Sequence, residues 1–105
     1  MTALSDSSFL GKISESENLV IKLSADWCSP CKALAPIFSE LADQFEGEVD
    51  CATIDIDMNP EASLHFEISS IPALIFFKKG TLVKKLVGAI PRNKLVNEFS
   101  ELLNA

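Results

Sequence analysis

The stretch that decides the fold is Trp27-Cys28-Ser29-Pro30-Cys31-Lys32. It lies between an apolar, β-branched segment at residues 19–23 and a segment at residues 34–45 whose apolar residues recur at helical spacing. The first pattern predicts a strand, and the second predicts an amphipathic helix. A C-x-x-C pair beside a βαβ pattern is typical of a redox motif.

The position of the two cysteines favours thiol chemistry. A thiol at a helix N-terminus faces unpaired backbone N–H groups and the positive end of the helix dipole, and both stabilise the thiolate. Because Cys28 comes first, we expect it to be the exposed nucleophile. Cys31, one turn inside the helix, is within reach and can resolve a mixed disulfide. Pro30 fixes φ near the helical value and stiffens the short ring.

Two other interpretations of the pair are open. The cysteines could form half of a zinc site, but a structural site needs four ligands, and only Cys51 and His65 remain as candidates. The pair could also be chemically inert. We expect Cys51 to be a small buried hydrophobe, with a regulatory thiol as the alternative. We expect His65 to be a surface residue rather than the base of a Cys–His enzyme, and we expect no metal.

The rest of the chain predicts an α/β domain. Before the motif, Ser5 and Asp6 are expected to cap a short helix that buries Phe9, Leu10 and Ile13. The other expected elements are strands at 49–56, 73–77 and 81–87, a short extra strand at 2–4, and helices that begin at Asn59 and Pro91. We therefore expect one domain, residues 1–105, in which four helices cover both faces of a mixed sheet of four or five strands.

Composition and charge exclude several classes of protein. The chain has 15 acidic and 9 basic residues, a net charge of −6, and no basic cluster for nucleic acid. The longest apolar run, residues 71–77, is far too short to span a membrane, and the N-terminus lacks a secretory pattern. We expect a cytoplasmic monomer, in a compartment where structural disulfides are rare.

Further motifs accompany the cysteine pair along the chain. They are Pro36, Asp55-Ile56-Asp57, Asn59-Pro60, Ile71-Pro72-Ala73, Phe77-Lys78-Lys79-Gly80 and Val87-Gly88-Ala89. In this order, and over nearly the whole length, the chain resembles the thioredoxin family. The resemblance implies a thioredoxin-like fold and a thiol–disulfide oxidoreductase that reduces protein disulfides.

The resemblance also implies roles for residues around the thiols. Ile71-Pro72 would be the family's cis-proline corner, packed against the cysteine pair, with a backbone free to pair with an extended client segment. The shallow apolar groove around Cys28 would be completed by Trp27, Gly88 and Ala89. Simpler interpretations are ordinary packing of Trp27 and a strand-end bend at Gly88.

Partners follow from the same resemblance. A thioredoxin reductase would recharge the pair, and the flavin and NADPH would belong to that enzyme. This chain would need no cofactor beyond its redox-active Cys28–Cys31 disulfide, and its clients would be disulfide-containing proteins. Two alternatives are open. One is a docking module with redox as a secondary activity, and the other is a dedicated oxidant or isomerase, against which the reducing compartment counts.

Four positions depart from the family pattern. Ser29 replaces the commonest glycine and is expected to adjust the redox poise, and Ser24 stands where a second tryptophan is frequent. Lys22 stands where a buried aspartate is usual beneath the cysteines, and Thr53 replaces that aspartate's usual lysine neighbour. The acid–base pair has therefore been replaced.

Lys22 has three possible roles. A buried lysine either loses its proton or finds a partner. Neutral Lys22 would serve as a base for Cys31, whereas charged Lys22 would stabilise a thiolate and make the pair more oxidising. A Lys22 that reaches the surface would touch neither thiol.

Overall fold

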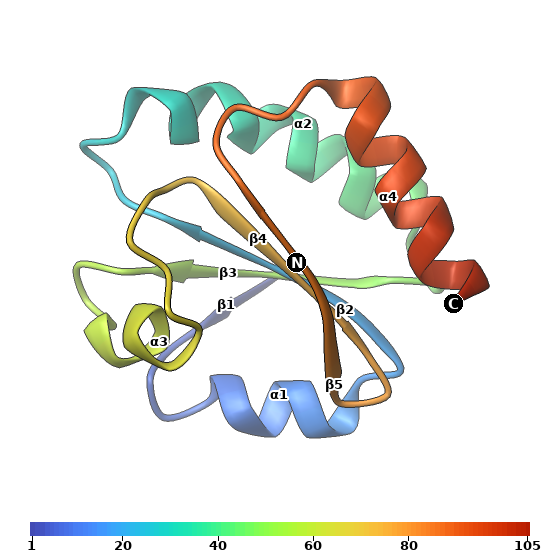
Figure 1. Cartoon of the computed structure of the whole chain (residues 1–105), viewed down its shortest axis with the longest axis horizontal. Helices are drawn as coiled ribbons and strands as arrows, with labels where there is room; N and C mark the ends of the chain where they lie inside the picture. The colour runs from blue at the N-terminus through green and yellow to red at the C-terminus, as the bar shows by residue number, and fades with distance from the viewer.

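The computed structural model describes all 105 residues and contains nine helices and strands (Figure 1). Their order along the chain is β1 (Thr2–Leu4), α1 (Phe9–Glu15), β2 (Asn18–Ser24), α2 (Ser29–Gln44), β3 (Asp50–Asp55), α3 (Pro60–His65), β4 (Ala73–Lys78), β5 (Thr81–Val87) and α4 (Arg92–Asn104). The predicted order of helices and strands is confirmed, including the short first strand.

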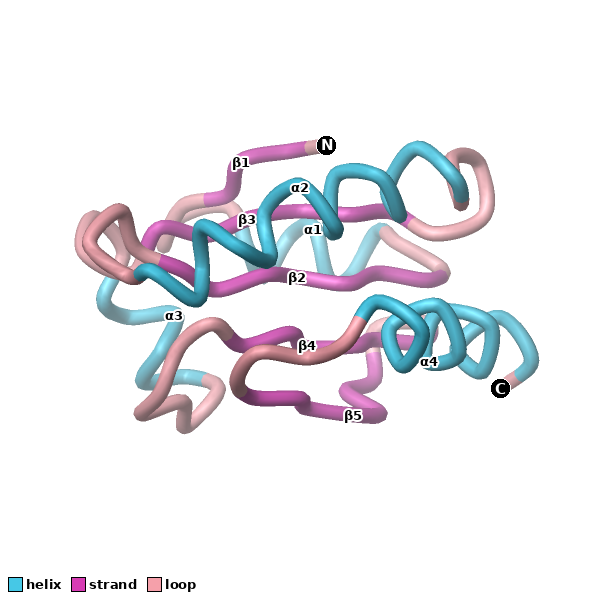
Figure 2. Tube along the Cα trace, turned by 90° about the horizontal axis from the view of Figure 1, so that it is seen from above, coloured by secondary structure: helices cyan, strands magenta, loops and turns pink.

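The five strands form one mixed sheet in the order β1-β3-β2-β4-β5 (Figure 2). Neighbours β1, β3 and β2 run parallel, whereas β4 is antiparallel to β2 and β5 is antiparallel to β4. The central strands β2 and β4 are buried on both faces, which explains their nearly continuous apolar sequences.

Two helices cover each face of the sheet, α2 and α4 on one and α1 and α3 on the other (Figure 1). The buried side chains therefore form two apolar clusters, one on each face. The α2–α4 cluster comprises Val20, Leu34, Phe38, Leu41, Phe45, Val49, Cys51, Leu74, Phe76, Leu95, Phe99 and Leu102. The α1–α3 cluster comprises Leu4, Phe9, Ile13, Leu19, Ile21, Leu23, Ala52, Ile54, Ala62, Phe66, Ala73, Ile75 and Phe77.

The first helix differs from the prediction in two respects. Leu10 is 56% exposed, whereas Phe9 and Ile13 are buried. Residues four apart share a helix face, so this short helix turns Leu10 away from the sheet. Moreover, Asp6 does not cap α1. Its carboxylate accepts hydrogen bonds from the backbone N–H groups of Glu61 and Ala62, and so caps α3.

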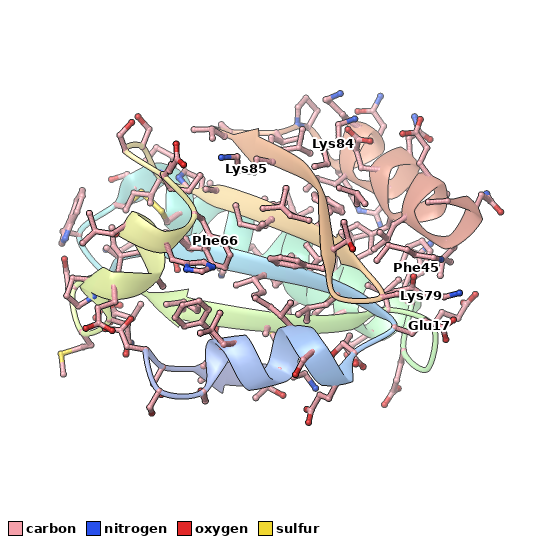
Figure 3. The ribbon with its side chains drawn as sticks, turned by 60° about the horizontal axis from the view of Figure 1, so that its bottom comes forward. Glu17, Phe45, Phe66, Lys79, Lys84 and Lys85 are labelled. Carbon is pink, nitrogen blue, oxygen red and sulfur yellow. A yellow bond between two sulfur atoms is a disulfide. The ribbon has the colours of Figure 1, made fainter.

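The edge strand β5 is attached to the body of the protein at both faces. Its turn from β4 has positive φ at Lys79 and Gly80, 50° and 82°, which matches a tight hairpin turn, and the Lys79 N–H donates to the Glu17 carbonyl. Farther along, Lys84 forms an ion pair with Glu98 of α4. Lys85 donates to the Phe66 carbonyl after α3 (Figure 3). The consecutive residues Lys84 and Lys85 therefore bind to α4 on one face of the sheet and to the end of α3 on the other.

Candidate redox site

The topology brings three separate segments to one end of the sheet. In the register of the central strands, Leu23 near the end of β2 pairs with Ala73 at the start of β4. Ala73 in turn pairs with Val87 at the end of β5. The Trp27–Lys32 motif, which follows β2, is thereby placed beside the residues that precede β4 and those that follow β5.

The two cysteines form a disulfide at the start of α2. Cys28 is the N-cap residue, and its Sγ accepts a hydrogen bond from the Cys31 backbone N–H at 3.2 Å. The Cα atoms of the pair lie 5.2 Å apart, within the usual range for a disulfide. The predicted placement, with Cys31 one turn inside the helix, is confirmed.

Cys28 is more buried than we predicted. It is only 5% exposed and Cys31 is 3% exposed. Burial follows from the disulfide and from the Ile71 carbonyl oxygen, which lies 3.9 Å from the Cys28 Sγ. Cys28 nevertheless lines an open groove, so one side of its side chain faces outward.

That groove, called here the outer groove, has a mixed lining. It is formed by Trp27, Cys28, Ser29, Pro30, Ser69, Ser70 and Ile71. The outer groove is thus only partly apolar, because three serines line it. Trp27 is 67% exposed and is held in place by its indole N–H, which donates to the Asp57 carboxylate at 2.8 Å.

The corner at Ile71-Pro72 has the geometry that the family resemblance implied. The peptide bond between them is cis. Neither backbone polar group of Ile71 pairs with another backbone group, and its carbonyl oxygen lies beside the Cys28 Sγ. Gly88, at φ 102°, donates its N–H to the Pro72 carbonyl at 2.9 Å and thus braces the corner from β5.

Gly88 and Ala89 do not line the outer groove. Gly88 instead contacts Pro72, and Ala89 lines a second groove with Ile90 and Pro91. Pro30 lines both grooves, so the two adjoin there. Pro30 therefore lies between Ala89 and the outer groove.

Lys22 and Cys31 line a cavity distinct from the outer groove, called here the inner cavity. Its lining residues are Lys22, Ser24, Ala25, Asp26, Cys31, Lys32 and Ala35. The Lys22 side chain lies between α2 and the sheet, and the residue is only 8% exposed although it lines this open cavity. The disulfide thus borders two cavities, Cys28 the outer and Cys31 the inner.

The neighbours of Lys22 within the sheet and on α2 are uncharged. Its strand neighbours are Thr53 on β3 and Leu74 on β4, and its Nζ lies 5.6 Å from the centre of the Phe38 ring. The ammonium group forms no ion pair, and burial lowers the pKa of Lys22 from its usual value. In place of the family's buried aspartate and its lysine neighbour, the structure has a buried lysine, Lys22, beside Thr53.

The remaining candidates lie away from the disulfide. Cys51 is a free, buried thiol in the α2–α4 cluster, and burial raises its pKa to about 12. His65 is exposed on α3, with its ring against Phe9 and Phe66. No group of three or more His, Cys, Asp or Glu side chains is arranged to hold a metal ion.

Sequence reasoning assigned no role to three residues of the site. Asp57 is part of the Asp55-Ile56-Asp57 motif, but its bond to Trp27 joins residues 30 positions apart. Ser69 and Ser70 were available as a polar pair directly before the proline corner. Their signal was weak because serines before a strand also suit an ordinary loop.

Comparison with known proteins gives the family. A thioredoxin family profile matches residues 1–101. The chain belongs to the thioredoxin family. It is 42% identical to a thioredoxin of Staphylococcus epidermidis and 41% identical to one of Staphylococcus aureus, in each case over 95% of both chains.

The fold comparison agrees with the sequence comparison. One solved structure superposes on this chain with a TM-score of 0.89. It comes from work on the thiol-resolving mechanism of yeast mitochondrial 1-Cys peroxiredoxin through the glutathione and thioredoxin systems. It is 26% identical and covers 96% of this chain and 94% of its own. The thioredoxin-like fold is confirmed.

The activity follows from the family together with the cysteine pair. This thioredoxin-family chain is a thiol–disulfide oxidoreductase of the protein-disulfide reductase type. Its redox partners are disulfide-containing proteins. None of its helices is both long enough and apolar enough to cross a membrane.

Proposed function

We propose that this chain reduces protein disulfides by dithiol exchange, with Cys28 as the attacking thiol and Cys31 as the resolving thiol. The observation that carries the proposal is the place of Cys28 at the N-terminus of α2, facing the outer groove beside Ile71. The helix N-terminus stabilises a thiolate, and the Cys28 Sγ already accepts one backbone hydrogen bond there.

The exchange takes two steps. The Cys28 thiolate attacks one sulfur of the client disulfide, so a mixed disulfide forms and the other client sulfur leaves as a thiolate that takes a proton from solvent. Cys31 then loses its proton and attacks the Cys28 Sγ. The Cys28–Cys31 bond forms, the first client sulfur leaves, and two electrons have passed from the chain to the client.

We assign client binding to the outer groove and its neighbour. The exposed face of Trp27 offers an apolar contact, and the unpaired backbone of Ile71 supports strand-like pairing with an extended client segment. Pro72 would hold this backbone in place, Gly88 would brace Pro72, and Ala89 would extend the contact beyond Pro30. Ser29 and Pro30, the first helical residues, would tune the redox poise of the pair.

The proposal includes an electron source and a compartment. Each cycle consumes two electrons, and we assign their supply to a thioredoxin reductase that carries the flavin and NADPH, so this chain has no cofactor of its own. A reducing role suits the cytoplasm. The structural neighbour from peroxiredoxin work supports peroxiredoxins as one client class.

Insulin reduction tests the assignment of the cysteines. With dithiothreitol as electron source, the wild-type chain should accelerate insulin precipitation, and Cys28→Ser should lose this activity. Cys51→Ala is the matched control, because it removes a cysteine that lines neither the outer groove nor the inner cavity, and it should keep the activity.

Trapping separates the two roles. Cys31→Ser should accumulate a covalent adduct with insulin through Cys28, visible by mass spectrometry, and Cys28→Ser should not. An adduct through Cys31 in the Cys28→Ser variant would reverse the assignment. A wild-type chain that binds clients but reduces none would support a docking module instead.

A further inference from the structure

The inner cavity sets the environment of Cys31 apart from that of Cys28. Cys31 and Lys22 both line this cavity, and Cys28 does not. The two other charged groups that face it are Asp26 and Lys32, which are exposed and of opposite sign. Lys22 is therefore the buried charge on the Cys31 side of the disulfide.

Two features favour the charged form of Lys22. Its Nζ lies over the Phe38 ring, a contact that attracts a cation. The side chain also lines an open cavity, so its amino group retains access to water despite the burial of the residue. No carboxylate pairs with it, so its positive charge is not neutralised locally.

We infer that Lys22 is a positioning residue for the resolving step, in which its ammonium group stabilises the Cys31 thiolate across the inner cavity. This inference rests on the proposed role of Cys31 as the resolving thiol. The Cys31 proton passes to water in the cavity, the thiolate attacks the Cys28 Sγ, and the client sulfur leaves and is protonated by solvent. Lys22 keeps its own proton throughout.

Thiol titration in a Cys28→Ser background tests the electrostatic effect. Burial raises the pKa of Cys51 to about 12, so Cys51 stays protonated near neutral pH and the ultraviolet absorbance of the thiolate there reports on Cys31. Lys22→Met should lower the thiolate population at neutral pH about tenfold, as expected for the loss of one nearby opposite charge. Lys22→Arg should preserve it, and Lys79→Met, which removes an exposed lysine of the β4–β5 turn, should have no effect.

The reaction of the reduced chain with Ellman's reagent separates the two steps. A first release of the chromophore reports attack by Cys28, and a second reports resolution by Cys31. Lys22→Met should slow the second phase about threefold, because a more basic thiolate is scarcer but also more nucleophilic. The first phase should keep its rate. If Lys22→Met does not fold by circular dichroism, Lys22→Gln serves as the neutral variant.

Each result supports or overturns the inference. Unchanged titration and an unchanged second phase in the neutral variants would overturn it. Loss of the second phase in both Lys22→Arg and Lys22→Met would also overturn it. Arginine keeps the positive charge but cannot act as a base, so this result would assign Lys22 the role of a neutral base. Absence of a first phase in the wild-type chain would instead contradict the proposed function.

Discussion

At the scale of single residues, the disulfide joins two sulfurs with different surroundings. Cys28 faces the outer groove, where clients would bind, and Cys31 faces the inner cavity with Lys22. An attacking thiol must meet a partner protein, whereas a resolving thiol only needs to reach its neighbour. The two environments therefore match the two steps of the proposed exchange.

Cys51 provides a prediction at the same scale. Burial raises its pKa from 9.0 to about 12, which lowers its thiolate fraction about a thousandfold at neutral pH. In a Cys28→Ser/Cys31→Ser variant, we therefore expect negligible reaction with Ellman's reagent in the folded state and rapid reaction in guanidinium chloride. Rapid labelling of the folded variant would show that Cys51 is an accessible thiol, as a regulatory role would require.

At the scale of helices and strands, contacts between distant elements hold the site end of the sheet together. The antiparallel direction of β4 carries the start of that strand to the end of β2, so the proline corner meets the cysteine motif. Asp6, before α1, caps the N-terminus of α3, and its backbone N–H donates to the Asn59 side chain. The short helix α3 is thus ordered by a residue more than fifty positions away.

The Asp6 cap gives a prediction for stability. Asp6→Ala removes an acceptor from two backbone N–H groups and should lower the free energy of unfolding by about 1 kcal/mol. Asp6→Asn retains an acceptor oxygen and should lose less. Urea denaturation measures both, with Asp43→Ala, an exposed aspartate of α2, as the control. Equal losses for Asp6→Ala and the control would contradict the capping role.

The junction between β5 and α4 gives a prediction for pH dependence. Burial raises the pKa of Glu98, but its bond with Lys84 and the charges of Lys84 and Lys94 outweigh burial, so the pKa lies below the usual 4.5. A lowered carboxyl pKa stabilises the fold above 4.5, and this stabilisation is lost as the pH falls through the lowered value.

Glu98→Gln should therefore lower the free energy of unfolding at neutral pH. The difference from wild type should shrink in urea titrations carried out at acid pH, below the lowered pKa of Glu98. Glu46→Gln, an exposed substitution, is the control. A difference that stays constant with pH would assign the loss to packing rather than to the ion pairs.

At the scale of the whole molecule, the sheet separates two apolar clusters but is common to both. Alternate residues of the same central strands enter the two clusters, as Val20 and Ile21 do in β2. Loss of either helix layer would therefore expose one face of β2 and β4. Such a shared sheet couples the two layers energetically.

We accordingly predict that residues 1–105 unfold as one cooperative unit. Trp27 is the only tryptophan, so its fluorescence reports on the site end, while far-ultraviolet circular dichroism reports on all helices and strands. Urea unfolding curves of the oxidised chain by the two probes should coincide, with a slope between about 1 and 3 kcal/mol/M. Separate transitions would indicate that the site end unfolds independently. Sedimentation of the folded chain would test the expectation that it is a monomer.

The sequence by itself determined what depends on local backbone geometry. Nearly continuous apolar runs predicted the central strands, and apolar residues at helical spacing predicted α2, because each pattern follows from the backbone geometry of one element. The C-x-x-C pair at the β2–α2 junction gave the chemistry, because both cysteines lie within one helical turn of each other.

Only the tertiary structure decided which distant residues meet. It brought Ile71 to Cys28 and Asp6 to α3, buried Lys22 beside Cys31, and left Leu10 exposed. These outcomes depend on the register between strands and on which face of a helix meets the sheet. Side-chain periodicity describes one element at a time, so it cannot supply that register.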